Sequence, residues 1–71
     1  MIKLGKYRHF KGNEYQVIAV AKHSETLEEF VVYQALYGEM GMWVRPATMF
    51  GESVEVARQL IKRFAYIEES E

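Results

Sequence analysis

The residues of this sequence best suited to chemistry are aromatic and basic side chains in two clusters. The first cluster is Tyr7-Arg8-His9-Phe10, followed by a turn at Gly12-Asn13, and the second is Trp43-Val44-Arg45-Pro46. Aromatic faces stack on planar groups, and guanidinium groups stack on rings or pair with carboxylates and phosphates. The composition predicts a polar binding surface made of Tyr7, Arg8, His9, His23, Tyr33, Trp43 and Arg45.

Arg45 is the most informative of these residues. It follows Val44 in a predicted strand, so its side chain is expected on the opposite face from that valine. There it has two alternative roles. Its planar guanidinium either clamps a carboxylate or phosphate of a partner, or it pairs with Glu25 or Glu52 and holds loops together.

Aromatic rings offer a second component of the surface. We expect a shallow aromatic face that draws on Tyr7, Tyr15, Tyr33, Tyr37 and Trp43. Small β-proteins bind peptides or bases on such faces. The alternative is that most of these rings belong to the core, and at least half of them are expected to be buried.

Catalytic and metal sites are not predicted. His9 and His23 are expected at strand ends, and a metal site needs three or four ligands that the spacing does not supply. Ser24 follows His23 directly, but neighbouring strand residues point to opposite faces, and the chain contains no Asp to orient an imidazole. The turn hydroxyls of Ser24 and Thr26 are better explained as partners of nearby backbone groups. No cofactor is expected, and a hydrolase using His23 is the least favoured interpretation.

Composition limits the class of protein. The chain has 71 residues, no Cys and 49% hydrophobic residues, so a small apolar core must form without disulfides. Nine basic and ten acidic residues give a net charge of −1, without the basic excess typical of a dedicated nucleic-acid domain. Basic residues gather before Glu14, and Glu68, Glu69 and Glu71 come last, which indicates either two solvated ends or a basic patch with an acidic tail. Charges interrupt every apolar stretch, so we expect a soluble, cytoplasmic protein with no membrane segment.

Alternation and turn residues predict a β-meander. The expected strands are Tyr7–Phe10, Tyr15–His23, Phe30–Tyr37 and Met42–Arg45, separated by turns that contain Gly12, Ser24 and Gly38. The second strand is expected to be central or bent. Residues 47–52 are expected to form a tight 3₁₀ or α segment in which Met49 and Phe50 fill the core.

The segment that follows supports two structures. Val54, Ala57, Leu60, Ile61 and Phe64 fall at helical spacing after Ser53, which predicts a helix from Ser53 to about Arg63. Alternation of Val54 with Val56 predicts instead a hairpin that turns near Arg58. Short strands joined by tight turns predict an all-β fold, a small SH3-like antiparallel barrel of about five strands in one domain over residues 1–71.

Several motifs occur in an order that resembles a known family, the bacterial domain of unknown function 1653. The motifs are Tyr7-Arg8-His9-Phe10-Lys11-Gly12-Asn13, His23-Ser24-Glu25-Thr26, Val31-Val32-Tyr33, Leu36-Tyr37-Gly38, Trp43-Val44-Arg45-Pro46, Met49-Phe50 and Arg63-Phe64. The resemblance covers roughly residues 7–67 and implies a small SH3-like barrel with no assigned activity. It favours the hairpin near Arg58, although the Asp-Gly turn and the Pro before the Arg-Phe pair are replaced here by Ala57-Arg58-Gln59 and Lys62.

These observations favour a non-enzymatic binding module that presents an aromatic and basic surface to a peptide, an RNA or a small anionic ligand. The alternative is a structural protein that assembles as a homodimer through an edge strand or through Met40 and Met42. Both methionines flank a predicted turn at Gly41, where apolar residues are unexpected.

Overall fold

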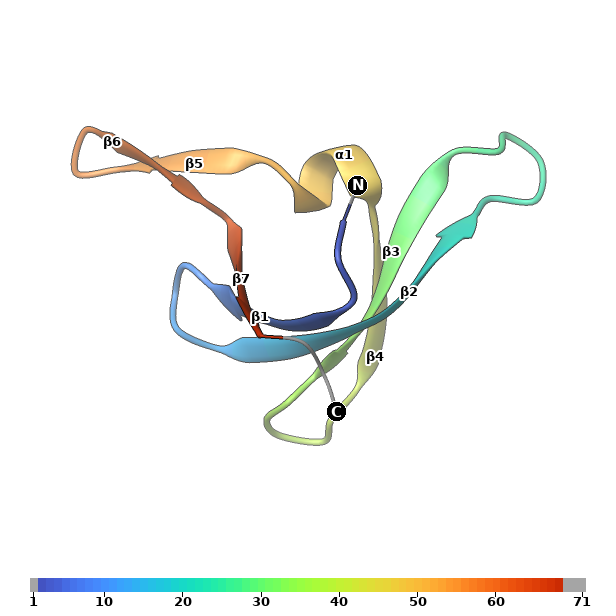
Figure 1. The fold of residues 1–71 in the computed structure, drawn as a ribbon, viewed down its shortest axis with the longest axis horizontal. Helices are drawn as coiled ribbons and strands as arrows, with labels where there is room; N and C mark the ends of the chain where they lie inside the picture. The colour runs from blue at the N-terminus through green and yellow to red at the C-terminus, as the bar shows by residue number, and fades with distance from the viewer. Residues whose placement is uncertain (1, 69–71) are drawn as a thin grey trace.

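The protein is mainly β (Figure 1), and the structure, a computed structural model, describes residues 2–68. The described residues form seven strands and one short helix: β1 (Gly5–His9), β2 (Glu14–Lys22), β3 (Glu29–Ala35), β4 (Met42–Pro46), α1 (Ala47–Phe50), β5 (Ser53–Val56), β6 (Gln59–Lys62) and β7 (Phe64–Glu68). The four meander strands therefore lie where the turn residues predicted them, within two residues at each end. Glu69 and Glu71 of the predicted acidic tail lie outside the described residues.

Five strands form one antiparallel sheet in the order β4-β3-β2-β1-β7, and β5 and β6 form a second, two-stranded sheet. As predicted, β2 is central and bent, because its register with β3 shifts between Val17 and Ala19. A second irregularity lies between Lys6 and Tyr7, where β1 meets β7. Within residues 2–68, β4 and β7 are the edges of the sheet, so the structure shows a curled open sheet and does not confirm the predicted closed barrel.

The core lies on the concave face of this sheet. Alternate residues of β3 are buried there, and the fully buried or nearly buried side chains are Tyr7, Val17, Val31, Tyr33, Ala35, Phe50 and Phe64. The rings of Phe50 and Phe64 stack with centroids 4.2 Å apart, and Tyr7 and Tyr33 meet Phe50 edge-on at 5.2 and 5.5 Å. Aromatic packing therefore supplies most of the core that this chain builds without disulfides.

The segment after Pro46 is the short helix α1, as predicted, but only one of its two expected core residues is buried. Phe50 is 2% exposed, whereas Met49 is 46% exposed, so the prediction that Met49 fills the core is wrong. A single helical turn presents one narrow stripe of side chains to a sheet, and consecutive residues lie about 100° apart around its axis. Phe50 takes the inward position, and Met49 is left at the surface.

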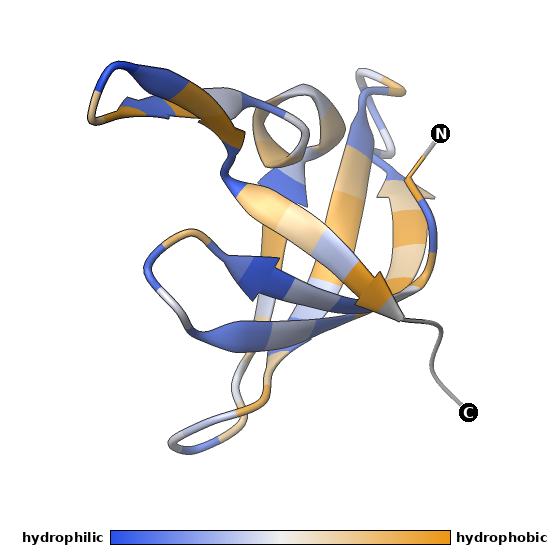
Figure 2. Ribbon diagram, turned by 60° about the vertical axis from the view of Figure 1, so that its left-hand side comes forward, coloured by the Kyte–Doolittle hydropathy of each residue, from blue (hydrophilic) through white to orange (hydrophobic). Residues whose placement is uncertain are grey.

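Residues 53–62 form a hairpin, which confirms the alternative that the family resemblance favoured and excludes the helix that the spacing predicted from Ser53 to about Arg63. Ser53 pairs with Lys62 and Val56 with Gln59, and the two strands project from the main sheet (Figures 1 and 2). The helical spacing was misleading because these apolar residues do not share a buried face. Leu60, which a helix would bury, is 78% exposed.

The hairpin turns through two residues that are poorly suited to their backbone conformation. Ala57 and Arg58 have φ values of 51° and 66°, the left-handed pair that favours Asn-Gly. We expect the double change Ala57→Asn with Arg58→Gly to raise the free energy of unfolding by about 1 kcal/mol, because it relieves this conformational cost. Thermal denaturation measures the gain. Ala57→Asn with Arg58→Ser removes the same charge without supplying glycine, and an equal gain from it would contradict the explanation.

No helix in residues 2–68 combines the length and the apolar character that crossing a membrane requires.

Candidate functional site

A small cleft opens on the concave face of the sheet near β4. It is lined by four aromatic side chains and one basic side chain, those of Tyr15, Tyr33, Tyr37, Trp43 and Arg45, and has a volume of about 210 Å³. We call it the aromatic–arginine cleft. Four of the five rings expected to form an aromatic surface therefore come together, and the fifth, Tyr7, is in the core.

Strand register explains why these residues share one face. Tyr33 of β3 lies opposite Trp43 of β4, and Val31 lies opposite Arg45. Residues directly opposite each other project to the same side of a sheet, and Val31 is completely buried on the concave side. Trp43 and Arg45 therefore also face the concave side, while Val44 between them faces outward, as the sequence predicted.

Arg45 is half-buried and held by aromatic residues. Its Nε–H donates to the Tyr33 hydroxyl at 3.3 Å, and its guanidinium carbon lies 5.6 Å from the centroid of the Phe64 ring. Among residues 2–68 the structure shows no ion pair between Arg45 and either Glu25 or Glu52. The role of holding loops through those carboxylates, one of the two alternatives from the sequence, is therefore absent, and the guanidinium keeps donors that no carboxylate in the described chain occupies.

Two tyrosine hydroxyls of the cleft pair with each other. The Tyr15 and Tyr37 hydroxyl oxygens lie 2.7 Å apart, and the Tyr15 ring also meets Tyr33 and Phe64 edge-on. Burial and the hydrogen bond with Tyr37 raise the pKa of Tyr15 to about 12. Tyr15 therefore carries no negative charge at neutral pH, and the charge in the cleft is that of Arg45.

More basic residues lie beside the cleft. The His9 ring packs 4.9 Å from Phe64, the same ring over which Arg45 lies, and its Nδ1 accepts a hydrogen bond from the Lys11 N–H at 3.2 Å. Burial, followed by the positive charges of Arg63, Lys11 and Arg45, lowers the pKa of His9 from its ordinary value of 6.5. Arg63 Nε is buried without a hydrogen-bond partner in the described chain. This end of the sheet is thus electropositive.

The shift at His9 makes stability depend on pH. The pKa of His9 is lower in the folded protein than in the unfolded chain. At a pH between these two pKa values the unfolded chain binds more protons, so the free energy of unfolding falls as the pH drops below about 6.5. We expect a lower urea midpoint at about pH 5.5 than at about pH 7.5, a range above the titration of most carboxylates. The same comparison in His9→Gln should give a smaller difference. Equal midpoints in the wild type would contradict this assignment.

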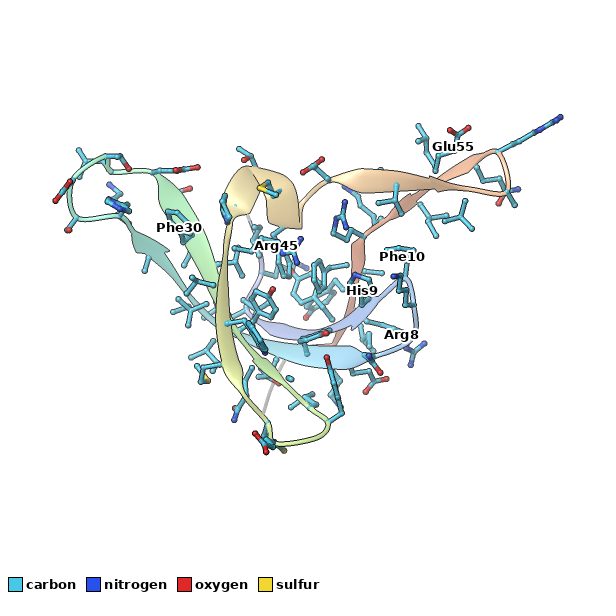
Figure 3. The ribbon with its side chains drawn as sticks, turned by 180° about the vertical axis from the view of Figure 1, so that it is seen from behind. Arg8, His9, Phe10, Phe30, Arg45 and Glu55 are labelled. Atoms are coloured by element: carbon cyan, nitrogen blue, oxygen red, sulfur yellow. The ribbon has the colours of Figure 1, made fainter. Side chains whose placement is uncertain are left out.

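Three predicted site residues lie outside the cleft, namely Tyr7, Arg8 and His23. Tyr7 is buried in the core, where its hydroxyl donates to the Lys3 carbonyl at 2.8 Å. Arg8 points away from the concave face and pairs with Glu14 at 2.7 Å, and Figure 3 shows it at the outer end of β1 while Arg45 lies near the centre. The structure therefore brings Tyr33, Trp43 and Arg45 together with His9 beside them, and leaves Tyr7 and Arg8 out.

His23 is also remote from the cleft, in the turn between β2 and β3. Its Nδ1 accepts hydrogen bonds from the backbone N–H groups of Glu25 and Thr26, at 3.1 and 3.3 Å. The Thr26 hydroxyl accepts the Glu28 N–H at 3.2 Å, which confirms the predicted turn chemistry for Thr26. No group of three or more His, Asp or Glu side chains in the described residues is arranged to hold a metal ion.

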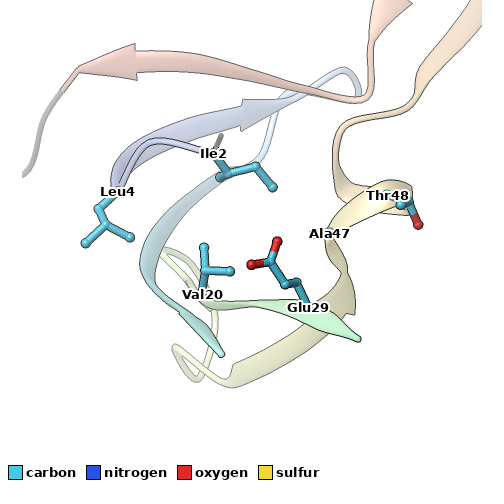
Figure 4. Close-up of a pocket in the computed structure, with 6 residues that line it drawn as sticks. All are labelled: Ile2, Leu4, Val20, Glu29, Ala47 and Thr48. Atoms are coloured by element: carbon cyan, nitrogen blue, oxygen red, sulfur yellow. The ribbon is translucent and has the colours of Figure 1, made fainter. Parts of the chain in front are cut away.

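A larger hollow of about 590 Å³ lies between the N-terminal residues, β2, β3 and α1 (Figure 4). Its lining is mostly apolar, with the Glu29 carboxylate at one side, and consists of Ile2, Leu4, Val20, Glu29, Ala47 and Thr48. No residue of the predicted binding surface lines it.

Arg63 and Phe64 lie at the site but are not among the site residues that the sequence predicts. Phe64 connects His9 and Arg45 because both lie against its ring. The sequence signal for Phe64 is the Arg63-Phe64 motif of the family resemblance, but only the pairing of His9 with Phe64 across β1 and β7 places this ring at the site. Tyr15 and Tyr37 belonged to the expected aromatic surface but not to the predicted site.

The fold and the cleft together define a small all-β protein with an open, curled sheet and an aromatic face around one arginine. The model of the family described as "Protein of unknown function (DUF1653)" matches residues 5–66, and the chain belongs to this family. It is similar to the crystal structure of a DUF1653 protein from Bordetella bronchiseptica, with 35% sequence identity and a TM-score of 0.87 over 99% of this chain and 92% of that one. Comparison with curated proteins gave no match.

Proposed function

We propose that this protein is a non-enzymatic binding module whose aromatic–arginine cleft takes a planar or anionic group of a partner. The observation that carries the proposal is the half-buried Arg45, fixed among rings and without a carboxylate partner in residues 2–68. A guanidinium held in this way can bind a carboxylate, phosphate or sulfonate group of a partner without first breaking an internal ion pair.

The shape and charge of the cleft support the same function. A volume of about 210 Å³ admits one side chain or one small ring rather than a whole cofactor. Trp43, which is 57% exposed, offers a face for stacking, and Lys11 and Arg63 add positive charge nearby. We also propose that the fold is related to SH3-like barrels, because five antiparallel strands curl around an aromatic face.

Benzenesulfonate, a flat ring with a permanent negative charge, is a suitable probe. Trp43 is the chain's one tryptophan, so its fluorescence reports on the cleft directly. We expect benzenesulfonate to change this fluorescence saturably and benzyltrimethylammonium to bind more weakly. Arg45→Gln should weaken benzenesulfonate binding by about tenfold, the loss expected when a charge-assisted pair is removed.

Arg8→Gln is the matched control, because Arg8 is an exposed arginine that pairs with Glu14 outside the cleft. It should bind benzenesulfonate like the wild type. If the two arginine variants bind equally well, or if the cation binds as tightly as the anion, the proposed function is wrong.

Self-assembly is a second candidate function, supported by the exposure of Met40, in the turn between β3 and β4, and of Met42, the first residue of β4. Light scattering tests it. A dimer that dissociates on Met42→Lys would favour assembly, whereas a monomer at millimolar concentration would exclude it.

A further inference from the structure

Strand β4 is an open edge of the main sheet, directly beside the cleft. It pairs with β3 on one side and has no neighbouring strand on the other within residues 2–68. Its side chains are unusually apolar for an edge, since Trp43 and Val44 are 57% and 63% exposed. Residues 42–45 of this edge contain no lysine, proline or bulge that would block pairing with another strand, and the proline of β4 is its last residue, Pro46.

The alternation of hydrogen-bonded and non-hydrogen-bonded pairs between β3 and β4 shows which backbone groups of β4 face outward. The Ala35 N–H donates to the Gly41 carbonyl at 2.9 Å, and hydrogen-bonded pairs then recur at every second residue of an antiparallel ladder. Trp43 and Arg45 therefore bond back to β3. The N–H and C=O groups of Met42 and Val44 point to the open side, and Pro46, the next residue in that series, has no N–H to offer.

An added antiparallel strand must pair with the outward backbone groups of β4. It would hydrogen-bond to Met42 and Val44, and two of its residues would lie opposite Trp43 and Arg45 in non-hydrogen-bonded pairs, where side chains approach most closely. Those two residues project to the concave face and so reach the cleft. Because the strands run in opposite directions, the residue opposite Arg45 comes first in the added strand, two positions before the residue opposite Trp43.

We infer that β4 receives an extended peptide segment of the pattern acidic–x–aromatic by strand addition. The acidic side chain meets Arg45, the aromatic side chain stacks on Trp43, and an apolar x residue lies beside Val44 on the outer face. This inference rests on the proposed function, since it names the partner that fills the same cleft. Only a polypeptide can use both the backbone edge and the cleft, which favours a peptide over a nucleic acid or a free anion.

Charge complementarity also argues against a second copy of this chain as the occupant. Two β4 strands paired about Val44 would place Arg45 of one copy opposite Trp43 of the other. Neither arginine would gain a carboxylate, and both positive charges would lie on the same face. An acidic peptide supplies the missing negative charge.

Capped synthetic peptides test the inference through Trp43 fluorescence. The probe is Lys-Thr-Glu-Val-Phe-Thr-Lys, and the control of identical composition is Lys-Thr-Phe-Val-Glu-Thr-Lys. We expect the first to bind at least about tenfold more tightly, because only its order matches an antiparallel strand on β4. Equal affinities would overturn the inference.

Backbone methylation of the probe tests strand addition without altering the protein. An N-methyl group on the valine removes the donor that faces the Val44 carbonyl, so binding should be lost. An N-methyl group on the phenylalanine alters an amide that points away from β4, so binding should remain. If both methylated peptides bind alike, the peptide does not add to this edge.

Protein variants separate this inference from the proposed function. Val44→Pro removes an outward N–H and leaves the β3–β4 ladder intact, so it should abolish peptide binding but keep benzenesulfonate binding, while Val44→Thr keeps both. Wild-type peptide affinity in Val44→Pro overturns the inference alone. Absence of benzenesulfonate binding in the wild type overturns the proposed function. A wild-type dimer that Val44→Pro dissociates would show that β4 pairs with a second copy, which also overturns the inference.

Discussion

Replacing Phe50 with alanine is expected to lower the melting temperature by at least about 12 °C. Removing a buried phenylalanine ring costs about 3–5 kcal/mol. A domain of this length has a total stability of only about 4–10 kcal/mol, so one ring represents a large part of it. Circular dichroism during heating measures the change.

The effect should be large because no neighbouring side chain can fill the space that the Phe50 ring occupies in the core. Its ring stacks on Phe64 and is met edge-on by Tyr7 and Tyr33, so alanine leaves a cavity between strands that the sheet holds at fixed spacing. Met49→Ala is the matched control in the same helical turn. Because Met49 is exposed, its loss should change stability by less than about 0.5 kcal/mol. Comparable effects from the two variants would contradict this view of the core.

Two replacements of Tyr33 are expected to separate its contribution to stability from its contribution to binding in the cleft. Tyr33→Ala should cost about 3–5 kcal/mol, because the ring is buried against Phe50, Phe64 and Tyr15. Tyr33→Phe keeps the ring and removes only the hydroxyl that accepts the Arg45 Nε–H. Its stability should change by no more than about 1 kcal/mol.

The phenylalanine variant should nevertheless bind benzenesulfonate more weakly. Without the hydroxyl, the Arg45 side chain loses the contact that fixes its orientation, and affinity should fall roughly fivefold, equal to about 1 kcal/mol. Urea denaturation and Trp43 fluorescence titration together measure the two effects. If Tyr33→Phe binds as well as the wild type, the hydrogen bond does not position Arg45.

Much of the fold could be predicted because the chain marks its turns clearly. Gly12 adopts a φ of 109°, which few other residues tolerate, and it lies in the turn between β1 and β2, where the sequence indicated a turn. The pairing of β1 with β7 was not predicted, since no local pattern connects residues so far apart. The hairpin at Ala57 and Arg58 was one of two alternatives, because these residues lack the turn preference that their conformation requires.

The site could be predicted only in part, for a reason found in strand geometry. Trp43 and Arg45 are two residues apart in one strand, so their grouping on one face followed from alternation. The predicted site contains Arg8 together with its neighbours Tyr7 and His9. Adjacent residues of a strand point to opposite faces, so Arg8 lies on the other face of β1. Tyr37 reaches the cleft from a turn, where alternation gives no guidance.

The position of β7 has a consequence for how the chain acquires its structure during synthesis. Strands β1 to β4 are neighbours in sequence and can pair as they leave the ribosome, whereas β7 must pair with β1 from the other end of the chain. Phe64 arrives with β7, so until then Phe50 has no ring to stack on and Arg45 no aromatic face beneath it. The core and the cleft are therefore completed in the same late step, and the nascent chain has neither a finished interior nor a finished binding face before it.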